Sequence, residues 1–280
     1  MTGTLVIAVL LLGGGAHPKA RIAWEHDFEK ALRKARVQNR PVLVDFWADW
    51  CSWCHLLDET TYVDPRVVEL SSAFVAVKVD TEGSSAGVAV ATRYNVDSLP
   101  TIAFLSPSGR QVFRLAGFQG PGQFPRTLET AKAKADKVMA WEAALENNPG
   151  DSRALMQLGV HLYDQDEYKD SRDLLSRASR CDVHHPLPER KKVRLLLGVI
   201  HHYDRDYSKA EELLLEALRL GQDAEQDPYV LYVLGRNYLK WGRKLDARRT
   251  LKKLVERYPD SPMAEKAWDT LMALEAGSPR

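Results

Sequence analysis

The spacing of hydrophobic and polar residues changes partway along the chain. From about residue 22 to 131, short apolar runs of strand length alternate with segments whose apolar residues recur at helical spacing. We expect helices at 27–37, 54–59, 67–70 and 88–94, strands at 42–46, 73–79, 101–105 and 111–115, and a long helix from about Phe124. The last two strands flank the turn at 106–109, which is typical of a hairpin. This order predicts a mixed α/β sheet flanked by helices.

The second half of the chain repeats a Leu-Gly pair. Its glycines stand at spacings of 39 and then 37 residues, and a small residue follows each of them twelve positions later: Gly159 and Ser171, Gly198 and Ala210, Gly235 and Ala247. Repeats of this kind, with small residues where two helices cross, are typical of helix-turn-helix solenoids. The block resembles the tetratricopeptide repeat, which implies an all-α solenoid. We place the repeats at about 152–185, 191–224 and 228–261, after a linking helix or half-repeat at 132–150 and before a C-terminal capping helix at 262–274.

The N-terminus carries an apolar run of eight residues, Leu5–Leu12, followed by small residues. This run is too short to span a bilayer but is typical of a secretory signal, although no Lys or Arg precedes it. We expect residues 1–20 to be a signal peptide or hydrophobic N-terminal segment, and the protein to be exported to the periplasm or cell envelope. Membrane association through this segment, a buried first strand and a cytoplasmic protein remain alternatives.

The composition excludes several classes of protein. Hydrophobic residues make up 45% and charged residues 28% of the 280 residues, as in ordinary soluble globular proteins. A formal net charge of +1 gives no overall attraction to nucleic acid. Three cysteines are too few for a disulfide-stapled secreted fold, but Cys51 and Cys54 are separated by only two residues, which points to local chemistry.

Cys51-Ser52-Trp53-Cys54 follows a predicted strand and begins a predicted helix. A thiolate at a helix N-terminus is stabilised by the free N–H groups there, and the second sulfur is close enough to resolve a mixed disulfide. With His55, the segment also fits covalent haem attachment, and two cysteines with one histidine suggest zinc. No convincing distal haem ligand or fourth zinc ligand is present, and two buried thiols without a role are the remaining alternative. We expect no cofactor and no metal.

The surrounding residues favour dithiol chemistry. The segment 42–54 closely resembles the active-site segment of the thioredoxin superfamily, and Leu99-Pro100-Thr101 resembles the cis-proline loop of that family. Trp47–Cys51 and Tyr62–Val67 are similar to the C-terminal periplasmic domain of DsbD-type thiol-disulfide interchange proteins. The resemblance covers roughly residues 24–130 and implies a thioredoxin-like domain at 21–131.

This resemblance implies a role for each matching residue. Cys51 is the exposed attacking thiolate, and Cys54 is the buried resolving thiol, so the two form a redox-active disulfide. Asp45 is a buried acid that relays a proton to the resolving cysteine, and its burial raises its pKa. The alternative for Asp45 is a carboxylate in water at the end of a strand. The usual lysine partner of this acid has no clear match, because Lys78 is expected to face outward.

Three further residues are expected to contact substrate. Trp50 packs against the active-site loop, Pro100 is cis and shields the thiol pair, and the backbone of Leu99 pairs with an extended substrate strand. Trp47 is expected to belong to the core. His55 is either a partly exposed helix residue or a titrating charge that tunes Cys51.

The repeat block has no catalytic constellation, and we expect its concave face to bind a protein partner. Met156 and Val160 occupy positions where repeats that clamp a terminal carboxylate have Lys and Asn, so that mode is unsupported. Cys181 is expected to be a packed thiol. Basic residues dominate the third repeat and form either a solvated face or a site for an acidic protein: Arg236, Lys240, Arg243, Lys244, Arg248, Arg249, Lys252, Lys253 and Arg257.

Together these features predict an exported thiol-disulfide oxidoreductase, of the protein disulfide reductase type, followed by a partner-binding repeat domain. Its partners would be disulfide-containing proteins, an upstream thiol electron donor and a protein on the repeats, with no nucleic acid. The alternative is a non-catalytic envelope scaffold that uses the repeats for assembly. A scaffold would not need both cysteines, so the Cys-x-x-Cys pair favours the enzyme.

Overall fold

The computed structural model describes residues 21–181 and 184–276, so the expected N-terminal signal lies outside the described residues. The chain divides into two compact units. The first contains the described residues up to Ser108 together with Arg114–Lys132, and the second contains Gly109–Phe113 and the described residues from Ala133 onward. Within the described ranges, no helix combines the length and apolar character needed to cross a bilayer.

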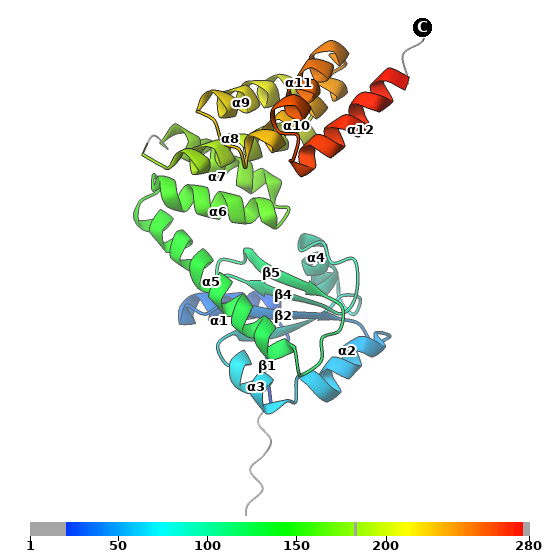
Figure 1. Ribbon diagram of the computed structural model, residues 1–280. Coiled ribbons are helices and arrows are strands. Elements are labelled where there is room, and N and C mark those ends of the chain that lie inside the picture. Colours follow the sequence, from blue (N-terminus) through cyan, green and yellow to red (C-terminus); the bar gives the residue numbers. More distant parts are fainter. Residues whose placement is uncertain (1–20, 182–183, 277–280) are drawn as a thin grey trace, which may run out of the picture. The chain divides into compact units, whose positions relative to one another are not determined.

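The first unit is built around a five-stranded sheet in the order β1-β3-β2-β4-β5 (Figure 1). The strands are β1 (Trp24–Glu25), β2 (Val42–Trp47), β3 (Val75–Asp80), β4 (Thr101–Leu105) and β5 (Gln111–Ala116), and the first part of β5, up to Phe113, is assigned to the second unit. The central strand β2 pairs parallel with β3 and antiparallel with β4. The sequence predicted four of these strands, and it missed β1, whose two residues are too short to show a period.

Helices follow the strands of this unit where capping residues allow them to begin. They are α1 (Phe28–Gln38), α2 (Ser52–Leu56), the π-helix η1 (Leu57–Thr61), α3 (Pro65–Ser71), α4 (Ser85–Arg93) and the first part of α5 (Phe124–Asn147), which belongs to the second unit from Ala133 onward. The carboxylate of Asp27 caps α1 by accepting from Lys30 N at 2.8 Å, and Ser84 caps α4. The helix expected at 54–59 is thus divided into a short α-helix and a π-helical turn.

The core of the sheet comes from apolar side chains on β2, β3 and β4, which pack against α1. Val42, Val44 and Phe46 on β2 are fully buried with Ala31 and Leu32 of α1. A strand that is buried on both faces reads as a continuous apolar run, as 42–46 does apart from one acid. The central position of β2 places its C-terminal end, and the loop that follows it, at one edge of a rigid sheet.

The second unit consists of paired helices. Three helix pairs and a last helix follow α5: α6 (Ser152–Asp164) with α7 (Tyr168–Arg180), α8 (Leu187–Tyr203) with α9 (Tyr207–Arg219), α10 (Asp227–Lys240) with α11 (Lys244–Arg257), and α12 (Pro262–Ala276). These elements confirm an α/β thioredoxin-type sheet followed by an all-α repeat block.

The repeated glycines mark the points where paired helices cross. A Cβ atom on Gly159, Gly198 or Gly235 would lie 2.5–2.8 Å from a leucine sixteen residues later in the partner helix. At the first crossing, the hydroxyl of Ser171 also donates to the carbonyl of Gly159 at 2.8 Å. The small residues are therefore required because the two backbones approach too closely for a larger side chain.

Candidate functional site

Cys51 and Cys54 form a disulfide at the start of α2, just beyond the end of β2. Cys51 is the N-cap of the helix, and its Sγ accepts a hydrogen bond from the backbone N–H of Cys54 at 3.2 Å. Only 3% of Cys51 and 1% of Cys54 is exposed. The expectation of an exposed Cys51 is therefore wrong for the disulfide form, because its sulfur is bonded to Cys54 and turned over the first helical turn.

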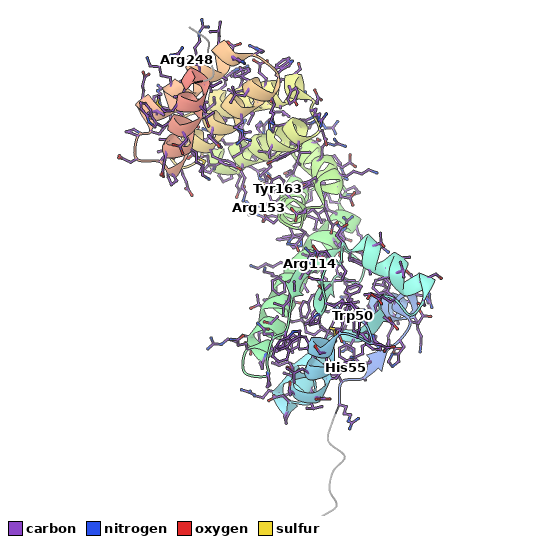
Figure 2. The ribbon with its side chains drawn as sticks, turned by 90° about the vertical axis from the view of Figure 1, so that its right-hand side faces the viewer. Trp50, His55, Arg114, Arg153, Tyr163 and Arg248 are labelled. Carbon is purple, nitrogen blue, oxygen red and sulfur yellow. A yellow bond between two sulfur atoms is a disulfide. The ribbon has the colours of Figure 1, made fainter. Side chains whose placement is uncertain are left out.

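Aromatic side chains around the disulfide are exposed instead of the sulfurs. Trp50 is 67% and Trp53 is 55% exposed, and the Trp53 ring lies 5.4 Å from that of Phe118. Trp50 was expected to pack against the active-site loop. It is largely exposed instead, and its indole Nε1 donates to Glu82 Oε1 at 3.0 Å. His55, which is labelled in Figure 2, is exposed. Its Nε2 lies 2.8 Å from the carbonyl oxygen of Asp49. The sulfurs thus lie beneath a rim of accessible aromatic surface.

Asp45 lies on β2 and is completely buried, as predicted. In the parallel pairing of β2 with β3, Asp45 is opposite Lys78, whose Nζ lies 3.1 Å from Asp45 Oδ2. The prediction that Lys78 faces outward is therefore wrong. Lys78 turns inward because its register brings it beside this buried carboxylate, and its ammonium also contacts both oxygens of Asp58, at 2.5 and 2.7 Å.

Aromatic rings complete the surroundings of Lys78. Its Nζ lies 5.4–5.6 Å from the ring centres of Trp24, Trp47 and Tyr62, distances at which a cation is attracted to the ring faces. Trp47 is half-buried and takes part in this cluster, so it contributes to the site as well as to packing. Asp58 and Tyr62 come from η1 and the residue that follows it, so the π-helical turn supplies part of the site.

Burial dominates the electrostatics of this cluster. Burial raises the pKa of Asp45 to about 6, and the neighbouring positive charge of Lys78 opposes the shift. Burial likewise raises the pKa of Tyr62 well above its ordinary value, and the carboxylates of Asp45 and Asp58 add to the effect. Asp45 therefore changes its charge close to neutral pH, and the Tyr62 hydroxyl stays protonated there.

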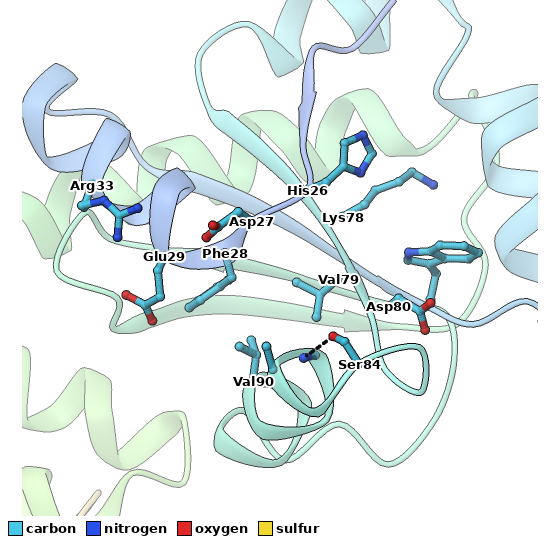
Figure 3. A pocket seen from close by; sticks show the side chains of 13 residues that line it. His26, Asp27, Phe28, Glu29, Arg33, Lys78, Val79, Asp80, Ser84 and Val90 are labelled. Carbon is cyan, nitrogen blue, oxygen red and sulfur yellow. Dashed lines mark hydrogen bonds between the residues drawn. The ribbon is translucent and has the colours of Figure 1, made fainter.

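A cavity of about 530 Å³ borders this cluster and is shown in Figure 3. Trp47 and Lys78 form part of its wall, and the apolar side chains of Phe28, Val79 and Val90 line its middle. The cavity therefore lies beside two residues of the cluster around Lys78.

The peptide bond between Leu99 and Pro100 is cis, as the resemblance implies. Pro100 is buried and Leu99 is half-buried, and both lie in the loop just before β4. The carbonyl of Pro100 accepts from Gly117 N at 2.8 Å, which ties this loop to the end of β5. The backbone next to the cis bond is thus held in a fixed position.

Sequence reasoning gave no role to Asp58, Tyr62, Glu82 and Phe118, which the fold brings to the Cys51–Cys54 end of the sheet or beside Asp45. They come from a π-helical turn and from loops after β3 and β5, so no local period marked them. One signal in the sequence could have identified Lys78. It is the only charged residue in the predicted strand 73–79, whose other residues are apolar. Such a residue requires a buried counter-charge, and the only acid in the neighbouring apolar run was Asp45.

The structure corrects one expectation in the repeat block and adds a detail to another. Cys181 is exposed rather than packed, because it caps the end of α7 beyond the last helical turn. The basic run of the third repeat is partly neutralised from outside that run, since Arg243 contacts Glu211 at 3.0 Å as well as Asp246 at 2.8 Å.

Family comparisons agree with both halves of this description. Residues 23–107 match the family model described as Thioredoxin-like, and residues 139–183 and 229–261 each match a tetratricopeptide repeat model. The thioredoxin-like part is similar to proteins named Thiol:disulfide interchange protein DsbD. The Pseudoalteromonas atlantica protein is 31% identical over 113 residues, and that of Cronobacter sakazakii is 36% identical over 111.

These similarities cover a limited part of each chain. Each alignment includes 39% of this chain and 19% of the relative, so this chain matches about a fifth of the length of these curated proteins. Among solved structures, a thioredoxin from Thermus thermophilus is 29% identical, with a TM-score of 0.38, and the match covers 41% of this chain and 90% of that one. With the sheet order and the helix pairs described above, the family matches show that this chain consists of a thioredoxin-like domain followed by tetratricopeptide repeats.

Proposed function

We propose that this chain is a thiol-disulfide oxidoreductase that reduces disulfides in protein substrates through Cys51 and Cys54. The observation that supports this most directly is the Cys51–Cys54 disulfide at the N-terminus of a helix, at the end of the central strand of a thioredoxin-like sheet. The partial similarity to thiol:disulfide interchange proteins favours the same chemistry.

In the proposed reaction the two sulfurs act one after the other. The Cys51 thiolate attacks one sulfur of a substrate disulfide, forms a mixed disulfide and displaces the other sulfur as a thiolate, which takes up a proton. The Cys54 thiolate then attacks Cys51 Sγ, closes the internal disulfide and releases the second substrate thiol. Two electrons pass to the substrate, so an upstream thiol donor must reduce the pair again. The N–H of Cys54 that contacts Cys51 Sγ supports the attacking thiolate.

In this proposal Asp45 accepts the proton that Cys54 must lose. With a pKa raised to about 6 by burial, Asp45 is mainly ionised at pH 7 but is much more basic than an ordinary carboxylate. Lys78 balances the negative charge, and its contact with Asp58, whose side chain is 42% exposed, links the buried acid towards water. Asp45 would therefore work as a general base whose charge is controlled by Lys78.

Substrate and partner contacts are part of the same proposal. Trp50 would contact the substrate beside Cys51, and the backbone at Leu99 and Pro100 would pair with an extended segment. We propose that the repeats bind a protein partner, and that the chain works in the periplasm or cell envelope, where disulfides persist.

The full-length protein, carrying Cys181→Ser so that one exposed thiol is removed, tests the proposal. We expect it to reduce insulin disulfides with dithiothreitol as donor, and Cys51→Ser to abolish this activity. The reduction potential of the pair should lie near about −270 mV, whereas a value near about −120 mV would make the protein an oxidant. A folded protein that exchanges no disulfides in either direction would contradict catalysis and favour the scaffold.

A further inference from the structure

A groove of about 300 Å³ opens beside the indole of Trp50 in the thioredoxin-like unit. It lies between this side chain, helix α4 and the loop that leads into the cis peptide bond. Its apolar wall is formed by Trp50, Val88, Ala91, Val96 and Leu99. The groove is therefore next to the two residues that would contact a substrate, and it has the dimensions of a side-chain subsite rather than of a cofactor pocket.

The polar part of the groove is acidic. Glu82 and Asp97 line it, and none of the ten described residues in its lining is Lys, Arg or His. The nearby guanidinium of Arg114 donates to the backbone carbonyls of Tyr94 and Asn95, and it does not line the groove. The two carboxylates thus line the groove without a cation among the described residues of its lining.

Local hydrogen bonds hold both carboxylates in place. Asp80 Oδ1 accepts from the backbone N–H groups of Glu82 and Gly83, at 3.0 and 2.8 Å, which fixes the turn that carries Glu82. Glu82 in turn accepts from the indole of Trp50 at 3.0 Å. Asp97 accepts from the hydroxyl of Ser98 at 3.3 Å. Each of these bonds involves one carboxylate oxygen, so each acid can still accept from a ligand.

We infer that this groove is a subsite for a lysine or arginine side chain of the substrate, close to the disulfide that is reduced. A long cationic side chain places its methylene groups against an apolar wall and keeps its charged end at a polar rim, which is the arrangement of this groove. The fixed indole of Trp50 adds an attractive surface for the cation. An acidic substrate residue would meet Glu82 and Asp97 and be repelled.

This inference rests on the proposed function, since it names the substrates that the Cys51–Cys54 pair would prefer. It predicts selection by charge for residues next to the substrate cysteine. Because the carboxylates are exposed, each contact contributes modestly, and together they should change the rate by about threefold to tenfold. Salt should reduce the preference, since exposed charges are screened within about 10 Å at 0.1 M ionic strength.

The test uses the reduced full-length protein in the Cys181→Ser background and short peptide disulfides that differ only in the residue before cysteine. That residue is lysine, norleucine or glutamate, and chromatography follows the release of peptide thiol. We expect the lysine peptide to react about threefold to tenfold faster than the norleucine peptide, and the glutamate peptide to react more slowly. The Glu82→Gln/Asp97→Asn variant should lose this order, so that the ratio of its rate with the lysine peptide to its rate with the norleucine peptide falls to about one. Glutamine at 82 retains an oxygen for the Trp50 indole.

A double variant with the same change in charge, Glu69→Gln/Glu129→Gln, is the matched control, because both residues are exposed on other helices of the same unit. It should keep the preference for lysine. Equal rates for the three peptides, or a preference that survives in the groove variant, would overturn the subsite but leave the dithiol reaction intact. If no peptide oxidises the reduced pair, the proposed function itself fails.

Discussion

Asp45 allows the electrostatics of the site to be tested as a change in stability. Its carboxyl is fully buried, and burial raises its pKa from an ordinary 3.8 to about 6. A folded pKa above the unfolded one means that the folded state binds the proton more tightly. The stabilising contribution is therefore complete below pH 3.8 and is lost as the pH rises towards 6. Each pKa unit corresponds to about 1.4 kcal/mol, so ionised Asp45 lowers the free energy of unfolding by about 3 kcal/mol at pH 7.

Asp45→Asn removes this ionisation and keeps the size of the side chain. The variant should match the parent protein below about pH 4, and it should be more stable by up to about 3 kcal/mol at pH 7. Lys78 is not left without a partner, since it keeps both oxygens of Asp58 at 2.5 and 2.7 Å. The same variant should resolve mixed disulfides more slowly, because the proposed proton acceptor is gone.

The measurement is urea unfolding of the oxidised full-length protein between pH 4 and 8. The readout is hydrogen exchange in peptides from β2 and β4. Exchange at these strands separates unfolding of the thioredoxin-like unit from that of the repeats. Asp49→Asn makes the same chemical change at an exposed position and should show no gain that depends on pH. A gain for Asp45→Asn that is equal at pH 4 and pH 7, or a loss of stability at pH 7, would refute this account of the buried carboxyl.

Three further changes test other parts of the structure. Cys54→Ser should accumulate mixed disulfides on Cys51, detected by mass spectrometry, whereas Cys51→Ser should trap almost none. Lys78→Met removes the cation beside Asp45, so the pKa of Asp45 should rise further, and the rate of mixed-disulfide resolution should shift to a pH about one unit higher or more. Gly198→Ala places a Cβ atom 2.7 Å from Leu214, and it should lower the stability of the repeats by about 1–3 kcal/mol in thermal unfolding.

Each of these changes has a matched control. Cys181→Ser should leave trapping unchanged, and equal trapping by both cysteine variants would contradict their division of roles. Lys137→Met, at an exposed position of α5, should leave the pH profile in place, and an unshifted profile for Lys78→Met would mean that its charge does not control the acid. Gly150→Ala meets its nearest atom at 3.5 Å and should have little effect. A similar loss from both glycine variants would contradict the close helix crossing.

Sequence pattern predicted the elements that depend on local period. The apolar run at 42–46 forms the central strand, because a strand that is buried on both faces requires apolar side chains at successive positions. The glycines of the Leu-Gly pairs lie at the helix crossings, because the close approach of two helices leaves no room for a larger side chain. The π-helical turn η1 was missed because it differs from an α-helix only in which carbonyl each N–H reaches. The five residues of η1 are too few for the spacing of apolar side chains to distinguish a π-helix from an α-helix.

The candidate site was predicted where its residues lie in segments that resemble the thioredoxin superfamily, and it was missed where a contact depends on strand pairing. Cys51, Cys54 and Asp45 fall within ten residues of one another, but Lys78 is recruited from a different strand. Its inward position depends on strand register and on rings supplied by Trp24 and Tyr62, none of which is encoded within β3 itself. Non-local pairing of this kind cannot be read from the period of a single strand.

The placement of Asp45 is itself an argument for function. The neighbouring residues on β2, including Val44 and Phe46, are fully buried and apolar, so an apolar residue at position 45 would suit the core better than a carboxylate. The partial compensation by Lys78 does not remove the effect of burial, because the pKa of Asp45 is still raised to about 6. A charge at the centre of the sheet that lowers the stability of the fold is explained by a functional role rather than by a contribution to folding. The proton transfer that we propose between Asp45 and Cys54 would supply that reason, because it requires a carboxyl that can gain and lose a proton near pH 6.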